Sequence, residues 1–142
     1  MATKADFSEE EWKTLQKGLT GAGMFVSASD QDFTDSFGEA HALAKFLAAQ
    51  HQQSDNVFIR DVAGTHGTGF GFSASAAKVQ SETLEALQVS IAILGSKAPD
   101  EVGPYQQLVL GLAEAVAEAK GGGVSEKETA AIAQIREALG SA

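Results

Sequence analysis

Apolar residues recur along this sequence at intervals of three and four, the spacing that places side chains on one face of an α-helix. Within a helix expected over residues 32–53, the clearest apolar stripe consists of Phe33, Phe37, Ala40, Ala44 and Leu47. No segment shows the sustained alternation of apolar and polar residues that a half-exposed strand requires. The spacing therefore predicts an all-α protein.

The first helix is marked by local signals at its start. Ser8 is followed three residues later by Glu11, the capping-box pair in which each side chain bonds the other residue's backbone amide. Phe7 and Trp12 flank this pair at the spacing of a hydrophobic staple. These signals predict a helix over residues 8–19.

Two short helices and three longer ones are expected further along the chain. Residues 20–29 are small and apolar, and Thr20 can cap a short helix there. Ser54 or Asp55 can cap a second short helix. Longer helices are expected over residues 75–96, about 104–120 and from 125 onward. In the second of these, one apolar face is formed by Tyr105, Leu108, Val109, Leu112 and Val116.

The helix expected over residues 75–96 should lie at the centre of the molecule, because its second half is apolar nearly all round. Pro99 suits the first turn of the next element, and Gly103-Pro104 breaks or restarts that element. The chain as a whole is expected to form a single all-α domain over residues 1–142. Its predicted architecture is an irregular bundle of five main helices plus one or two short ones.

The composition disfavours several classes of partner. The chain carries 10 Lys and Arg against 19 Asp and Glu, a formal net charge of -9, which repels nucleic acid and anionic membranes. The sequence contains no cysteine, no secretory signal segment and no apolar run of about 18 residues that could span a membrane. We therefore expect a cytoplasmic protein that binds neither nucleic acid nor membrane.

A glycine-rich segment, residues 64–72, raises the question of a phosphate-binding loop. Two of its glycines have the separation found in a Walker A loop, but Phe70-Gly71 stands where the loop's lysine and hydroxyl belong. The dinucleotide fingerprint also fails, because Phe72 occupies its third glycine position. We expect a connection between helices, with an exposed His66 and no organic cofactor.

Three acidic residues, Asp30, Asp32 and Asp35, begin like a calcium-binding loop. The pattern departs from that loop at position six, which is Asp35 instead of glycine, and at position twelve, which is His41 instead of glutamate. Carboxylates suit magnesium or calcium, so a weak divalent-cation site is one interpretation. The other is a charged helix start, where acidic residues are stabilised by the helix dipole.

No residue pattern points to catalysis, and we expect that the protein is not an enzyme. His41 and His51 lie almost three helical turns apart, and no H-E-x-x-H zinc motif is present. His51 is expected to be partly buried near a helix end. No G-x-S-x-G nucleophile motif occurs, and the carboxylates of Glu82 and Glu85 are expected on an exposed face.

The segment AKGGGVSEKE, residues 119–128, precedes the last expected helix, and Ser125 and Glu128 form a second capping box in it. Apolar residues follow at helical spacing, at Ile132, Ile135 and Leu139. This run resembles the start of the terminal helix in tellurite-resistance TerB-like domains, which are all-helical bacterial domains. Gly121 stands where that family has aspartate. The resemblance implies a compact helical domain and transfers no catalytic residue.

The sequence leaves two functions open. The first is a non-enzymatic cytoplasmic interaction or stress-associated module that binds a protein partner or itself. The second is a protein that binds a small ligand or a divalent metal in a pocket between helices. An exposed apolar patch would favour the first function, and a closed pocket with converging polar groups would favour the second.

Overall fold

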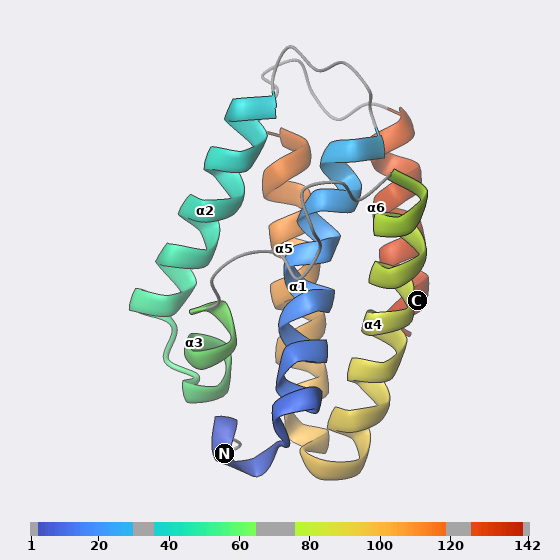
Figure 1. Cartoon of the computed structure of the whole chain (residues 1–142). Coiled ribbons are helices and arrows are strands. Elements are labelled where there is room, and N and C mark those ends of the chain that lie inside the picture. Colours follow the sequence, from blue (N-terminus) through green and yellow to red (C-terminus); the bar gives the residue numbers. More distant parts are fainter. Residues whose placement is uncertain (1–2, 30–35, 65–75, 119–125, 141–142) are drawn as a thin grey trace.

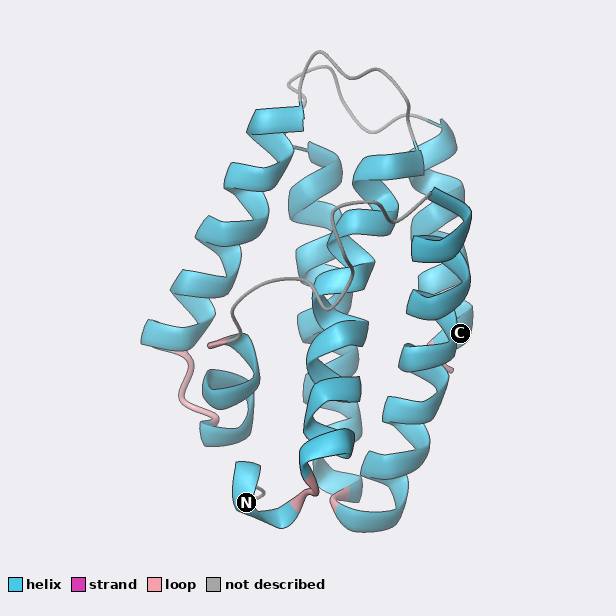
Figure 2. Cartoon of the chain, viewed as in Figure 1, coloured by secondary structure: helices cyan, strands magenta, loops and turns pink. Residues whose placement is uncertain are grey.

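The computed structural model describes residues 3–29, 36–64, 76–118 and 126–140. Within these residues the chain forms six α-helices and two short 3-10 helices, with no strand (Figures 1 and 2). The 3-10 helices are η1 (Lys4–Asp6) and η3 (Pro99–Glu101). The α-helices are α1 (Glu9–Ser29), α2 (Ser36–Gln53), α3 (Val57–Ala63), α4 (Ala76–Lys97), α5 (Val102–Glu118) and α6 (Glu126–Ala138). The predicted all-α bundle is confirmed, since five long helices and the short helix α3 fit the five main helices plus one or two short ones that the sequence indicates.

Helix α1 begins where the capping box predicts. The Ser8 backbone N–H donates to the Glu11 carboxylate at 2.8 Å, and the Glu11 N–H donates to the Ser8 hydroxyl at 3.1 Å. Phe7 packs on Trp12 with ring centroids 5.8 Å apart. Both rings also lie close to Phe58 of α3, at 5.8 and 6.0 Å between centroids. The predicted staple therefore also joins the start of α1 to another helix.

The end of α1 differs from the prediction. The helix continues without interruption to Ser29, and Thr20 lies inside it instead of capping a second helix. The Thr20 hydroxyl donates to the Gln16 backbone carbonyl at 3.0 Å. Ala22 and Val26 in this second half are fully buried. Their tertiary packing outweighs the weak helix propensity of the glycines nearby.

Helices α1 and α5 form the middle of the bundle, with α4 and α6 on one side and α2 and α3 on the other (Figure 1). Tyr105 of α5 is fully buried, and its hydroxyl donates to the Leu15 backbone carbonyl of α1 at 2.7 Å. Burial raises the pKa of Tyr105, so this phenol stays neutral. Gly18 makes the close approach possible, because a Cβ there would lie 2.8 Å from the Tyr105 hydroxyl.

The prediction that residues 75–96 form the central helix is wrong. Helix α4 buries one face, including Leu87 and Leu94, while Val89 is 41% exposed. Helix α5 instead contacts α1, α2 and α6. Small apolar residues such as Ala92 made α4 look apolar all round, but an exposed alanine has little surface to bury.

Helices α2 and α3 form a layer beside the central pair. The sequence predicts Ser54 or Asp55 as the cap of α3, but the structure shows Asn56 in that role. The Asn56 side-chain oxygen accepts a hydrogen bond from the Ile59 N–H at 3.3 Å. The Ser54 hydroxyl accepts from the Asn56 backbone N–H at 3.2 Å, so it shapes the turn that precedes the cap.

The start of α5 agrees with its proline pattern. Pro99 opens η3, and Gly103 and Pro104 lie in the first turn of α5, where backbone amides need no partner within the helix. The apolar residues predicted for this helix are all buried, namely Tyr105, Leu108, Val109, Leu112 and Val116.

Helix α6 packs against α1, α4 and α5. Its predicted face is buried, at Ile132, Ile135 and Leu139. The Gln106 side chain of α5 donates to the Leu139 backbone carbonyl at 2.7 Å and so holds the end of α6. The second predicted capping box requires Ser125, which lies outside the described residues. Among the helices of the described ranges, none is long and apolar enough to cross a membrane.

Candidate binding groove

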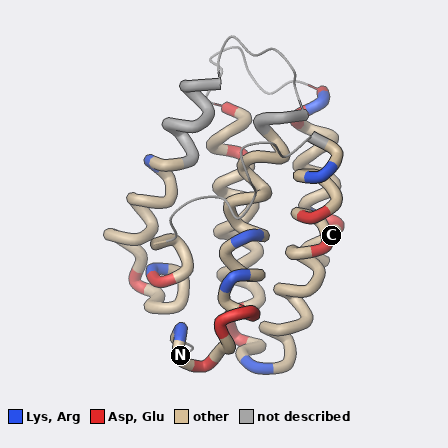
Figure 3. The backbone as a smooth tube through the Cα atoms, in the orientation of Figure 1, with Lys and Arg blue, Asp and Glu red and all other residues tan. Residues whose placement is uncertain are grey.

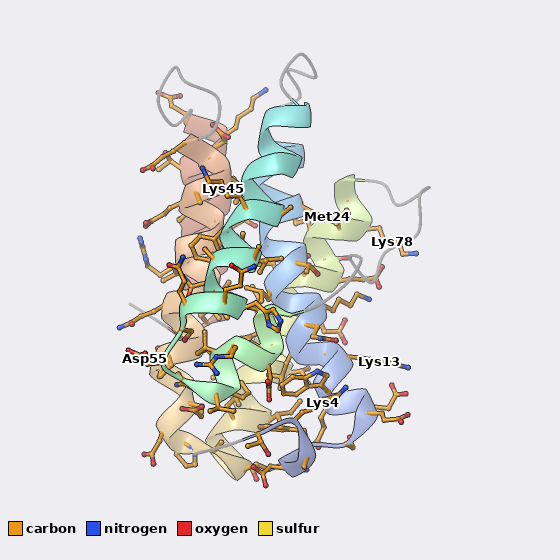
Figure 4. The ribbon with its side chains drawn as sticks, turned by 90° about the vertical axis from the view of Figure 1, so that its left-hand side faces the viewer. Lys4, Lys13, Met24, Lys45, Asp55 and Lys78 are labelled. Atoms are coloured by element: carbon orange, nitrogen blue, oxygen red, sulfur yellow. The ribbon has the colours of Figure 1, made fainter. Side chains whose placement is uncertain are left out.

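A groove of about 460 Å³ opens to solvent between α2, α3 and the first half of α5. Figure 4 shows the side of the molecule formed by α2 and α3, with Asp55 at the connection between them and Lys45 higher on α2. The groove is lined by Phe46, Gln50, Ser54, Asp55, Asn56, Ile59, Pro104, Gln107 and Leu108. Apolar and polar side chains therefore share its walls.

The apolar part of the groove rests on the core. Ile59 and Leu108 are buried, with 5% and 4% of their surface exposed. Phe46 is partly buried and packs against the backbone of α5 at Gly111. A Cβ at Gly111 would lie 3.1 Å from the tip of the Phe46 ring. The absence of a side chain at this position lets the ring lie directly on α5.

Several polar groups at the α2–α3 connection are already hydrogen-bonded within the protein. The Arg60 guanidinium donates twice to the Ser54 backbone carbonyl, at 2.8 and 3.2 Å. The His51 ring nitrogen Nδ1 lies 2.8 Å from the Arg60 backbone carbonyl. The Asn56 side chain caps α3 through its oxygen and donates through its nitrogen to Glu101 at 3.1 Å. These bonds hold this wall of the groove in place.

Three other polar side chains of the groove have unused hydrogen-bonding capacity. In the described part of the chain, no hydrogen bond or ion pair is made by the side chains of Gln50, Asp55 or Gln107. Asp55 and Gln107 are exposed and Gln50 is half-buried. A ligand in the groove can therefore meet a carboxylate and two amides without breaking an internal bond.

Glu101 is a buried carboxylate behind this wall. It is 6% exposed, and its Oε1 accepts the hydrogen bond from Asn56. Its Oε2 is also buried and has no hydrogen-bond partner among the described residues. The bond to Asn56 ties η3, which directly precedes α5, to the start of α3, and the Asn56 amide is oriented from both sides.

The segments that form the groove walls carry more acidic than basic residues. The basic residues of the segments that form its walls, residues 36–64 and 98–118, are Lys45 and Arg60. The acidic residues of the same segments are Glu39, Asp55, Asp61, Asp100, Glu101, Glu114 and Glu118. In Figure 3, α5 carries acidic positions and no basic ones. The local balance has the same sign as the net charge of the whole chain.

Most residues predicted to form special sites lie outside the described residues. These are Asp30, Asp32 and Asp35 of the acidic cluster, and residues 65–72 of the glycine-rich segment, including His66. Both interpretations stay predictions. Within the described residues, no group of three or more histidine, aspartate or glutamate side chains could hold a metal ion.

His51 and Glu82 differ from their predicted surroundings. His51 lies in the last turn of α2 as expected, but it is exposed instead of partly buried. Its ring rests against Gly64 at the end of α3. Glu82 is 31% exposed because it pairs with Lys17 of α1 at 2.6 Å, whereas Glu85 is exposed as predicted.

Sequence reasoning found the helices that form the groove but not the groove itself. Gln50 and Gln107 have the sequence context of ordinary surface residues, and only the packing of α2 against α5 brings them to one site. Gly111 was the available signal. A glycine inside an apolar helix leaves room for a close packing contact, and here the contact is Phe46 of α2.

Comparison with known proteins gives no match. No protein-family model, no curated protein and no solved structure is significantly similar to this chain.

Proposed function

We propose that this chain is a non-enzymatic helical interaction module that receives a protein partner in the groove between α2, α3 and α5. The observation that carries the proposal is the composition of the groove. It combines apolar lining residues, among them the partly exposed Phe46, with polar side chains whose hydrogen-bonding capacity is unused. Protein interfaces likewise combine apolar and polar surface.

The openness of the groove favours a protein partner over a small ligand. Small-molecule sites cover most of the ligand surface, whereas this groove is open to solvent on one side. A partner protein can extend its contacts beyond the groove onto α2 and α5. The resemblance of residues 119–128 to TerB-like domains adds a stress-associated role to the proposal, and the cysteine-free sequence supports a cytoplasmic location.

A small organic ligand in the same groove is the second candidate. Its support is the groove volume of about 460 Å³, which falls within the range of roughly 300–1,000 Å³ for small-molecule sites.

Site-specific photo-crosslinking in cells tests the proposed function. A benzophenone amino acid replaces Gln107 in the groove, and in a matched control it replaces Gln88, which is exposed on α4 away from the groove. We expect a discrete protein adduct from the Gln107 position alone. Equal adducts from both positions, or none from either, would contradict the proposal. An adduct of small-molecule mass at the Gln107 position would favour the second candidate instead.

A further inference from the structure

We propose that the partner presents a basic peptide segment to the groove, with an apolar side chain against the partly exposed ring of Phe46 and an adjacent lysine or arginine paired with Asp55. This inference rests on the proposed function and adds to it the chemistry of the partner. It follows from the charge, the hydrogen-bonding groups and the shape of the groove.

Asp55 is the one ionisable side chain among the residues that line the groove in the described structure. Its carboxylate is exposed and makes no ion pair there. Arg60 is the basic residue nearest to it in the sequence, but the Arg60 guanidinium is directed to the Ser54 backbone carbonyl by two hydrogen bonds. The Asp55 carboxylate is therefore available to a cationic group of a partner.

The wider charge distribution selects the same sign of partner. The segments that form the groove walls are net acidic, and the whole chain has a net charge of -9. Such a field attracts a basic segment, increases its association rate and repels an acidic one. The field also predicts that binding weakens as the salt concentration rises.

The two glutamines suit a peptide backbone. Gln50 belongs to α2 and Gln107 to α5, and both line the groove. Each amide has donors and an acceptor, so each can bond a backbone N–H or carbonyl of a segment that passes between the helices. The apolar side chains of the groove add hydrophobic contact with the peptide, which a carboxylate and two amides do not provide.

Selection from a random nonapeptide display library on the purified full-length chain tests this inference. We expect the enriched peptides to carry lysine or arginine next to a leucine, isoleucine, phenylalanine or methionine. The Kd of a synthetic enriched peptide is then measured for the wild-type chain, for Asp55→Lys and for Glu85→Lys. Both substitutions change the net charge equally, but Glu85 is exposed on α4 and does not line the groove.

The expected result is that Asp55→Lys weakens binding by about fivefold or more, while Glu85→Lys has a clearly smaller effect. Equal weakening by the two substitutions would mean that the overall field, and not Asp55, recognises the peptide, and would overturn the inference. A circular dichroism spectrum of each variant confirms that the helices are retained.

The outcomes separate this inference from the proposed function. Enriched peptides could instead be neutral or acidic and shift the side-chain amide resonances of Gln50 and Gln107 in nuclear magnetic resonance spectra. That result would overturn the proposal of a basic partner but leave the proposed interaction module in place. If the library yields no enrichment and the Gln107 position also gives no crosslink, both proposals fail. If crosslinking succeeds but no basic peptide is enriched, only the chemistry of the partner is overturned.

Discussion

At the scale of single residues, a few close contacts decide how the central helices meet. Tyr105 donates to the α1 backbone and lies 3.5 Å from the Ser90 hydroxyl of α4, so one phenol joins three helices. Gly18 leaves the space that this phenol occupies. A buried hydroxyl without a partner costs about 1–3 kcal/mol. A side chain at position 18 would displace the Tyr105 hydroxyl from its partners, so this contact requires glycine there.

We predict that Gly18→Ala lowers the free energy of unfolding by about 1–2 kcal/mol, although alanine is the better helix former by about 1 kcal/mol. The new methyl group would lie 2.8 Å from the Tyr105 hydroxyl and 3.1 Å from Leu87. Urea denaturation followed by circular dichroism measures the change.

Gly95→Ala is the matched control for this substitution, because a Cβ at Gly95 meets nothing within 4 Å. We expect it to leave stability unchanged or to raise it by up to about 1 kcal/mol. Equal stability of the two variants would show that the Tyr105 contact adjusts without cost.

At the scale of elements, the short helix α3 depends on residues outside itself. Its seven residues are too few to be stable alone. Asn56 caps it and links it to Glu101 of η3, and Phe58 packs on the Phe7 and Trp12 rings. The wall of the groove is thus held by both the cap and the core.

We predict that Asn56→Ala lowers the free energy of unfolding by about 1–3 kcal/mol, because it removes the cap and leaves both Glu101 oxygens without a donor. Asn56→Asp retains a capping oxygen but replaces the amide donor to Glu101 with a second carboxylate, so we expect it to be less stable than the wild type at pH 7. Chemical denaturation at pH 7 measures both effects. Wild-type stability for Asn56→Asp would contradict the role given to Glu101.

Two ion pairs join α1 to α4 and give the seam between them a pH dependence. Lys97 lies 2.5 Å from the Glu11 carboxylate, and Lys17 lies 2.6 Å from Glu82. The hydrogen bond from Lys97 lowers the pKa of Glu11, with a contribution from the Ser8 amide, and the hydrogen bond from Lys17 lowers the pKa of Glu82. A lowered folded-state pKa stabilises the protein above the unfolded-state value.

We therefore predict that the free energy of unfolding falls as the pH decreases below the usual carboxyl pKa of 4.5 and the two glutamates become protonated. The double variant Glu11→Gln, Glu82→Gln should show a shallower fall, since its amides do not titrate and a glutamine at position 11 still serves in the capping box. Denaturation curves between pH 3 and pH 7 measure this slope. Glu85→Gln, which alters an exposed glutamate outside these pairs, should keep the wild-type slope.

At the scale of the whole molecule, the net charge of -9 sets how the protein responds to ions. Divalent cations can act by screening the charge or by binding to a site such as the predicted cluster of Asp30, Asp32 and Asp35. The two effects differ in their dependence on particular residues, because screening depends on the total charge and site binding depends on the ligands.

We predict that millimolar calcium or magnesium raises the melting temperature above that in sodium chloride of equal ionic strength, since binding to the folded form alone stabilises it. The double variant Asp32→Asn, Asp35→Asn should lose this additional stabilisation. Thermal melts followed by circular dichroism measure both. An unchanged response in the variant would remove the cluster as a cation site and leave it as a charged helix start.

The sequence by itself determined the features that depend on neighbours along the chain. The Ser8 and Glu11 capping box, the Phe7 and Trp12 staple and the apolar face of α5 are all present as predicted. Capping and periodicity act over three or four residues, so the printed order of residues contains them in full.

The tertiary structure decided the features that depend on contacts between distant segments. It kept α1 continuous through Thr20, placed α5 instead of α4 in the middle, and brought Gln50 and Gln107 to one groove. The physical reason is that burial and close approach depend on which helix faces meet, and many pairings of apolar faces satisfy the same periodicity. Contacts such as Gly111 with Phe46 select one of these pairings, and only the packed bundle shows which.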